Sequence, residues 1–200
     1  MTDPETIRVY DTRAAEYAAR FQGARDPAQD AFASALPARA RVLDLGCGPG
    51  HMAARLADAG HEVLATDASA EMVRLAGRHP GVKARQATFD DLGALPPASL
   101  DGVWANFSLL HAPRDRFDAH LADIATALRP GGLFHIGMKT GKDSARDALG
   151  RSYTYYSAVD LTARLDAQGF EILEQSQGAE AGLAGAVEPW ITLLTRKTDG

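Results

Sequence analysis

Apolar residues follow two alternating patterns along this chain. Apolar positions spaced by three and four residues predict amphipathic helices, whereas short apolar runs bounded by glycine or proline predict buried strands. The helical pattern occurs at residues 4–21, 27–36, 51–59, 69–78, 114–128 and 157–168. The strand pattern occurs at residues 41–45, 62–66, 82–87, 100–105, 133–138, 170–175 and 189–196. Segment 141–156 follows neither pattern, and we expect a polar loop there.

The alternation of strands and helices predicts an α/β fold. Such a pattern builds a parallel sheet with helices on both faces, connected by right-handed crossovers. The last two predicted strands are joined by a short, turn-rich link, so we expect a hairpin whose final strand is antiparallel. The expected architecture has three layers around a mostly parallel seven-stranded sheet with an antiparallel last strand. At 200 residues, the chain fits one domain.

Composition and charge argue against several classes of protein. The net charge is −5 and no run of basic residues occurs, which argues against a nucleic-acid partner. Cys47 is the single cysteine, so no disulfide can form within the chain, and no Cys/His spacing suggests a metal site. Residues 1–10 lack an apolar signal core, and no apolar stretch reaches the roughly 20 residues that span a bilayer. We therefore expect a cytoplasmic protein with no metal and no membrane association.

The strongest chemical signal is segment 42–50, Val-Leu-Asp-Leu-Gly-Cys-Gly-Pro-Gly, where a predicted strand meets a predicted helix. Gly46 and Gly48 allow a tight turn and let a ligand approach the backbone without a Cβ in the way. The helix that begins near Gly50 adds free N–H groups and the positive end of its dipole. Asp44 precedes the turn and can hold a cationic ammonium group. The alternative is a tight turn without a ligand, because a glycine triplet alone has low specificity.

The second signal is Asp67, at the end of the second predicted strand. It lies about 20 residues beyond the glycines, where an acidic residue at the ligand crevice accepts hydrogen bonds from the hydroxyls of a ribose. The alternative is a helix N-cap, since Ser69 and Glu71 follow, and the two roles are compatible.

In these residues the chain resembles the class I S-adenosylmethionine-dependent methyltransferases. The family's first motif matches residues 44–50, and an acidic residue ends its second strand as Asp67 does here. Further matches in order and spacing are residues 89–92, 100–106 and 129–132, and Tyr10, Asp11 and Tyr17 of the first predicted helix. The resemblance covers nearly the whole chain. It implies a Rossmann-like methyltransferase fold with a helical cap at 1–38, a cofactor-binding core at 39–140, and an acceptor-side loop and C-terminal hairpin at 141–200.

The resemblance also implies an enzyme that transfers the methyl group of S-adenosylmethionine to an acceptor and releases S-adenosylhomocysteine. It places the glycine loop around the methionine part of the cofactor, with the ammonium near Asp44, the carboxylate within reach of Tyr17 and the ribose hydroxyls on Asp67. Thr88 and Asp90 are alternative partners for the amino group of the adenine. The implied cofactor-binding residues are Tyr17, Asp44, Gly46, Cys47, Gly48, Gly50, Asp67, Ala68, Met72, Thr88, Phe89, Asp90, Asn106, Phe107 and Ser108.

His111 is the candidate general base. In this family the residues just past the fourth strand line the methyl-transfer crevice, and here they are Asn106, Phe107 and Ser108. His111 follows them closely, and its reference pKa of about 6.5 suits proton transfer at neutral pH. The alternative is a histidine that merely packs in the loop before Pro113.

Segment 141–156 is the candidate acceptor-binding segment. It follows the fifth predicted strand, and ligands of open α/β sheets bind at the carboxyl ends of the strands. Arg146 and Arg151 have the chemistry to clamp an anion, and Tyr153 and Tyr155 add aromatic surface that is costly to expose. The alternative is a solvated loop with its tyrosines packed on the rim.

Three functions are compatible with these residues. The favoured one is methyl transfer to a small-molecule acceptor, because little chain is left for a large acceptor-binding domain. The second is a non-catalytic protein of the same fold that binds the cofactor as a sensor or partner subunit. The third is a nicotinamide dinucleotide enzyme, whose fingerprint needs a glycine three residues after Gly48, where His51 stands. The sequence carries no prediction of the acceptor's identity or of the oligomeric state.

Overall fold

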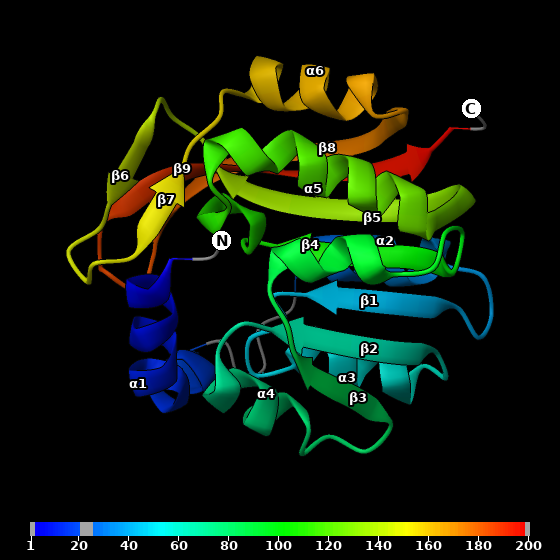
Figure 1. Ribbon diagram of the computed structural model, residues 1–200, viewed down its shortest axis with the longest axis horizontal. Coiled ribbons are helices and arrows are strands. Elements are labelled where there is room, and N and C mark those ends of the chain that lie inside the picture. The colour runs from blue at the N-terminus through cyan, green and yellow to red at the C-terminus, as the bar shows by residue number, and fades with distance from the viewer. Residues whose placement is uncertain (1–2, 21–25, 199–200) are drawn as a thin grey trace.

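The computed structural model describes residues 3–20 and 26–198 and contains a seven-stranded sheet (Figure 1). Its strands are β1 (Arg41–Leu45), β2 (Glu62–Asp67), β3 (Val82–Gln86), β4 (Leu100–Asn106), β5 (Leu128–Lys139), β8 (Phe170–Ala181) and β9 (Val187–Lys197). Their order across the sheet is β3-β2-β1-β4-β5-β9-β8. Neighbours from β3 to β5 are parallel, whereas β9 runs antiparallel to both β5 and β8. The predicted sheet is confirmed.

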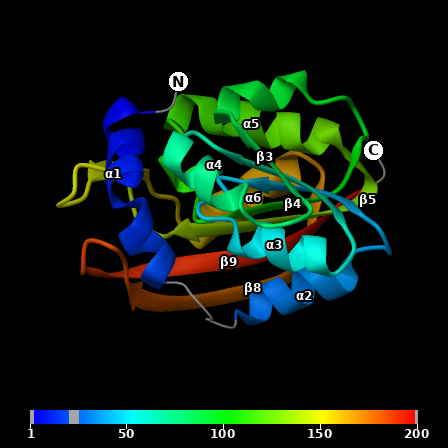
Figure 2. The same cartoon turned by 90° about the horizontal axis from the view of Figure 1, so that it is seen from below.

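Helices cover both faces of this sheet, so the predicted three layers are also confirmed. The helices are α2 (Pro27–Ala35), α3 (His51–Asp58), α4 (Ala70–Ala76), α5 (Arg114–Ala127) and α6 (Ala158–Ala167). α5 and α6 lie on one face, whereas α2 and α3 lie on the other (Figures 1 and 2). In β4, Val103 and Ala105 pack with α5 and α6, whereas Trp104 packs with α2 and α3. Burial on both faces explains why the central strands β1 and β4 are mostly apolar, whereas the edge strands β3 and β8 are largely polar and exposed.

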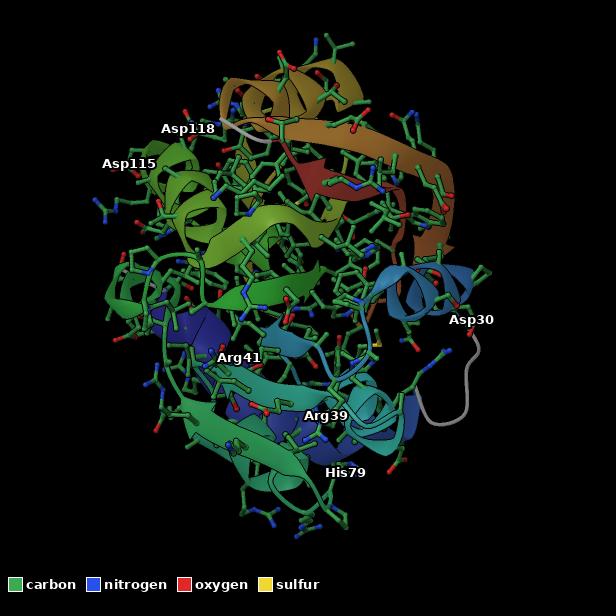
Figure 3. All side chains as sticks on the ribbon, turned by 90° about the vertical axis from the view of Figure 1, so that its right-hand side faces the viewer. Asp30, Arg39, Arg41, His79, Asp115 and Asp118 are labelled. Atoms are coloured by element: carbon green, nitrogen blue, oxygen red, sulfur yellow. The ribbon has the colours of Figure 1, made fainter. Side chains whose placement is uncertain are left out.

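Helix α1 (Pro4–Arg20) lies across one end of the sheet, where the parallel strands finish (Figure 1). Its backbone leaves the helical range at Arg13, with φ −113° and ψ 16°, which kinks the helix. The predicted helix extends to residue 21, which lies outside the described residues. The parallel strands begin at the opposite end of the molecule, seen in Figure 3, where Arg41 at the start of β1 is labelled.

Segment 141–156 differs from the predicted loop, because it contains a hairpin of β6 (Ser144–Arg146) and β7 (Ser152–Thr154). Strands of three residues are too short to show a periodic pattern in the sequence. Two short 3₁₀ helices, η1 (Phe89–Ala94) and η2 (Leu109–His111), also lack a pattern that predicts them. The β6–β7 hairpin lies at the same end of the sheet as α1 (Figure 1). Within the described parts of the chain, no helix is long and apolar enough to cross a membrane.

Candidate functional site

A cavity opens beneath α1, at the carboxyl ends of β1, β2 and β4. Its empty space is about 670 Å³, counted out to the open mouth. Helix α1 supplies one wall, and the segments that follow the strands supply the others. The lining residues are Thr6, Ile7, Tyr10, Tyr17, Leu45, Gly46, Gly48, Asp67, Ala68, Ser69, Met72, Ala87, Thr88, Phe89, Asn106, Phe107, Ser108 and His111. This is the edge at which open α/β sheets bind ligands.

Glycines shape the turn between β1 and α3. The N–H of Gly46 donates to the carbonyl of Thr66 in β2, with N and O 2.8 Å apart. Gly46 has a φ of +71°, and a Cβ at this position would lie 2.3 Å from the Cβ of Ser108. Gly48 has a φ of +53°, and a Cβ there would meet only the ring of Tyr17, at 3.6 Å. Position 46 therefore needs glycine for close packing, whereas Gly48 offers bare backbone to a ligand.

Four residues assigned to the cofactor lie outside the cavity lining, namely Asp44, Cys47, Gly50 and Asp90. A Cβ at Gly50 would lie 2.7 Å from Ala76 of α4, so this glycine serves packing between helices. The Cys47 thiol is buried, and burial raises its pKa, which keeps it neutral. Burial likewise raises the pKa of Asp44 to about 7, and its Oδ2 has no partner among the described residues. A contact between Asp44 and a ligand ammonium stays a prediction.

Asp67 ends β2 and lines the cavity, at the position predicted for a ribose contact. Its Oδ2 accepts from the N–H of Gly48 and its Oδ1 from the N–H of Ser69, each at 2.9 Å. Burial raises the pKa of Asp67 to about 6, and the nearby carboxylate of Asp11 acts in the same direction. The N-cap of α4 is Ser69, whose hydroxyl accepts from the N–H of Met72 at 3.1 Å. Asp67 is therefore not the helix cap, and its carboxylate faces the ligand space.

Thr88 and Asp90, the alternative adenine partners, lie in different surroundings. Thr88 lines the cavity, and its N–H and hydroxyl both donate to Asp91 Oδ2, at 2.7 and 3.0 Å. Asp90 lies outside the lining, and its carboxylate is 3.6 Å from the guanidinium of Arg116. Of these two residues only Thr88 lines the cavity, and a contact between Thr88 and the adenine stays a prediction. The other lining residues assigned to this part of the cofactor are Ala68, Met72 and Phe89.

The chain leaves β4 through residues 106–108, and all three line the cavity. Asn106 Oδ1 accepts from Nε2 of His135 at 3.0 Å, and burial lowers the pKa of His135 to about 3, which keeps that ring neutral. Phe107 has a φ of +55°, an uncommon conformation for a bulky residue. Ser108 Oγ is buried and has no partner among the described residues. An unpartnered buried hydroxyl beside a cavity is a group that a ligand can satisfy.

His111 lines the cavity beside Tyr10 of α1. Nδ1 of His111 lies 2.6 Å from the carbonyl oxygen of Ser152, which can only accept, so Nδ1 carries the proton. Nε2 therefore holds the lone pair and accepts from the Tyr10 hydroxyl at 2.8 Å. Burial lowers the pKa of His111 to about 4, so the ring is neutral at pH 7. The helical pattern predicts Tyr10 only as an apolar position, because no local signal shows that α1 meets η2.

Arg146 and Arg151 lie outside the lining, and each has a carboxylate partner within this chain. The two Nη atoms of Arg146 bind the carboxylate of Asp3 at 2.9 and 2.8 Å. Arg151 is buried; its Nε and Nη2 bind Asp147 Oδ2 at 2.9 and 2.7 Å, and its Nη1 donates to the Tyr10 hydroxyl at 3.0 Å. The predicted anion clamp is therefore not supported, because it needs free guanidinium groups and the fold neutralises both.

Tyr153 and Tyr155 pack near the cavity and lie outside its lining. Tyr153 is buried, and the ammonium of Lys139 lies 4.0 Å from the centre of its ring. The hydroxyl of Tyr155 donates to Glu188 at 3.1 Å, and the same carboxylate pairs with Lys139. The structure thus favours the alternative in which these tyrosines pack on the rim.

Hydrogen bonds hold α1 over the cavity. Thr6 Oγ1 accepts from the N–H of Ser152 in β7 at 2.9 Å. Asp11 Oδ1 accepts from the hydroxyl of Ser69 at 2.6 Å and from the N–H of Glu71 at 3.2 Å. These contacts tie α1 to the β6–β7 hairpin and to α4, so the helix covers part of the ligand space.

Comparison with known proteins identifies residues 42–132 as a methyltransferase domain. The malonyl-[acyl-carrier protein] O-methyltransferase of Enterobacter lignolyticus is 32% identical over 187 residues, which cover 92% of this chain and 70% of that protein. A ubiquinone biosynthesis O-methyltransferase of Xanthomonas campestris pv. campestris is 38% identical over 107 residues, which cover 51% of this chain and 44% of that protein. The chain thus matches less than half of the second relative.

A solved structure adds evidence on the ligand. The 1,6-didemethyltoxoflavin-N1-methyltransferase of Burkholderia thailandensis, with S-adenosylhomocysteine bound, has a TM-score of 0.75 and 26% identity, covering 96% of this chain and 88% of that one. These similarities replace the nicotinamide dinucleotide interpretation. The strand order and the glycine turn next to Asp67 agree with them. The chain therefore belongs to the class I S-adenosylmethionine-dependent methyltransferases.

Proposed function

We propose that this methyltransferase acts on a small-molecule acceptor. The observation that carries the proposal is the cover formed by α1, whose contacts with Ser69 and Ser152 turn the strand ends into a partly closed compartment. Concave sites of this kind bury most of the surface of a small ligand. The solved relative from Burkholderia thailandensis, which holds 1,6-didemethyltoxoflavin, supports this size of acceptor.

The cavity wall fits S-adenosylmethionine. We assign the methionine part to the bare backbone of Gly48 and to the unpartnered hydroxyl of Ser108, with Tyr17 beside them. The ribose hydroxyls are assigned to the carboxylate of Asp67, and the adenine to the pocket that includes Met72. When bound, the cofactor supplies a methyl group that its positively charged sulfur makes electrophilic.

The protein's own contribution is to place the acceptor and to exclude water. Such positioning is worth roughly 7–11 kcal/mol when the reacting atoms are held in line. Asn106 is suited to this role, because its hydrogen bond to the neutral ring of His135 fixes its side chain at the exit of β4. Helix α1 limits access of solvent to the same space.

The proposal is tested by incubating the protein with cofactor labelled in its methyl group and a cell extract containing metabolites and macromolecules. We expect the label in the small-molecule fraction after filtration. Label found only in protein or nucleic acid would reject the small-molecule acceptor. Cofactor binding without transfer to any fraction would favour the sensor or partner-subunit interpretation.

Replacing Asp67 by alanine is expected to weaken binding of S-adenosylhomocysteine by about 1–3 kcal/mol, the range for losing a buried, charged hydrogen-bond partner. The carboxylate lines the cavity and fixes the N–H of Gly48, so both contacts are lost together. Titration calorimetry measures the change. Asp58→Ala, an exposed carboxylate at the end of α3, is the control and should bind normally. An unchanged dissociation constant in Asp67→Ala would remove this residue from the site.

Binding of S-adenosylhomocysteine should also depend on pH. The pKa of Asp67 is raised to about 6 in the free protein, and a ligand diol that donates to the carboxylate favours its ionised form. Binding therefore releases a proton below about pH 6, and the affinity for S-adenosylhomocysteine rises with pH. This affinity should be about tenfold higher at pH 7 than at pH 5. Asp44, with a pKa of about 7, titrates nearby, so the matched variant Asp67→Asn isolates the contribution of Asp67. The same pH dependence in Asp67→Asn would contradict this assignment.

A further inference from the structure

Hydrogen bonds with a defined donor direction run from the buried Arg151 to Tyr10 and from Tyr10 to His111, and the last two residues line the cavity. Nη1 of Arg151 donates to the Tyr10 hydroxyl at 3.0 Å. The hydroxyl donates in turn to Nε2 of His111 at 2.8 Å, because Nδ1 of that ring already donates to the carbonyl of Ser152. The direction follows from the chemistry of the two ends, since a guanidinium can only donate and a carbonyl can only accept.

The three residues of this hydrogen-bond network lie at different positions relative to the ligand. Tyr10 and His111 line the same cavity as Asn106, which is suited to placing the acceptor. Arg151 is buried outside the lining and is neutralised by Asp147. A phenolic oxygen has two acceptor lone pairs, and Arg151 occupies one of them. The oxygen of Tyr10 can therefore accept one further hydrogen bond, from a hydroxyl group in the cavity.

The charges around the cavity favour an uncharged acceptor. No lysine or arginine occurs among its lining residues, as far as the structure describes them, whereas the carboxylate of Asp67 does line it. The nearby cations are paired within the chain: Arg146 with Asp3, Arg151 with Asp147 and Lys139 with Glu188. Among the described lining residues, an anionic acceptor would find no cation to replace its water.

We propose that Tyr10 is a catalytic residue that takes the proton from a neutral hydroxyl acceptor, such as a phenol, and passes its own proton to His111. In this arrangement Arg151 and Asp147 are positioning residues, because they hold the Tyr10 oxygen without lining the cavity. The inference deepens the proposed function and rests on it.

The transfer balances in atoms and charge. The acceptor O–H proton moves to the oxygen of Tyr10, while the Tyr10 proton moves to Nε2 of His111. The electron pair left on the acceptor oxygen forms the new bond to the methyl carbon, and the broken carbon–sulfur bond leaves its pair on sulfur. The positive charge of the sulfonium is lost as the imidazolium of His111 gains one, so the net charge of the buried site does not change. His111 then releases its proton to solvent, because burial holds its pKa at about 4.

The first experiment tests the acceptor class. The full chain is incubated with methyl-labelled S-adenosylmethionine and a panel of simple phenols, each paired with the benzoate of the same ring. We expect label in the phenols. Label in the benzoates alone, or in no phenol although S-adenosylhomocysteine binds, would overturn this inference and leave the proposed function standing. Absence of S-adenosylhomocysteine binding would overturn both.

The second experiment tests the proton path with Tyr10→Phe. For a phenol with a pKa of about 10, we expect kcat to fall about 100-fold, within the range for general base catalysis, with binding of S-adenosylhomocysteine unchanged. For a nitrophenol assayed at about pH 6, where it is still neutral, the more acidic proton needs less help from a base, so the loss should be less than about tenfold. Equal losses for both acceptors would show that Tyr10 acts only through packing. Tyr156→Phe, the same change at a buried tyrosine that packs on Phe117, is the control.

A third measurement does not depend on activity. In ¹⁵N NMR spectra of the imidazole groups, His111 should be neutral at pH 7, with its proton on Nδ1. Its Nε2 signal should shift in Tyr10→Phe, because the hydroxyl that donates to it is removed. A proton on Nε2 in the unmodified protein would exclude donation from Tyr10 to His111, and the inference would fail with it.

Discussion

Replacing Gly46 by alanine is expected to destabilise the protein by about 2–5 kcal/mol. The positive φ of +71° costs a residue with a Cβ about 1–2 kcal/mol. The added methyl group would lie 2.3 Å from the Cβ of Ser108, and such overpacking costs about 1–3 kcal/mol more. Urea denaturation measures the loss. Because domains of this size are stable by roughly 5–15 kcal/mol, the variant should unfold at a much lower urea concentration.

Gly131→Ala is the matched control for this prediction. Gly131 has a similar φ, +74°, but nothing lies within 4 Å of the position its Cβ would take. Its loss should therefore be confined to the backbone contribution of about 1–2 kcal/mol. Equal losses in the two variants would show that the contact with Ser108 is not what requires glycine at position 46.

Arg151→Met is expected to destabilise the protein by about 3–5 kcal/mol, because it leaves a buried carboxylate without its cation. The side chains of Arg151 and Asp147 are only 3% and 8% exposed, so water cannot replace the missing partner. Methionine keeps most of the aliphatic stem, which separates the loss of charge from a loss of packing. The free energy of unfolding at pH 7, from thermal or urea denaturation, measures the change.

Arg146→Met provides the comparison for Arg151→Met. The Arg146 side chain is 47% exposed, and its pair with Asp3 is open to water, so its loss should be at most about 1 kcal/mol. The two arginines stand five positions apart in sequence and have the same chemistry. Comparable losses in the two variants would contradict the distinction between a buried and an exposed pair.

The sheet and the cofactor edge are predictable from the sequence because they depend on local patterns. The apolar run at 41–45 bounds β1 correctly, and the end of the next run places Asp67 beside the cavity. Gly46 and Gly48 are recognisable because only glycine suits a tight turn at a strand end. Each of these signals lies within a few residues of the structure it predicts.

The acceptor side is less predictable because its contacts join distant parts of the chain. Arg146 binds a residue 143 positions away, and Arg151 donates to Tyr10 from 141 positions away. A sequence does not show whether an arginine is free or paired, so the pairing of Arg146 with Asp3 and of Arg151 with Asp147 could not be predicted. Tyr10 was missed as a site residue for the same reason, since its hydroxyl meets His111 only after α1 crosses the sheet end.

The position of β9 between β5 and β8 has a consequence for the order of folding. Among the described strands, β8 pairs only with β9, so β8 cannot join the sheet before β9 does. The two strands are separated by a link of only five residues, 182–186, and closing so short a loop carries a small entropic penalty. The hairpin can therefore form before it pairs with β5, and its two strands can join the sheet together.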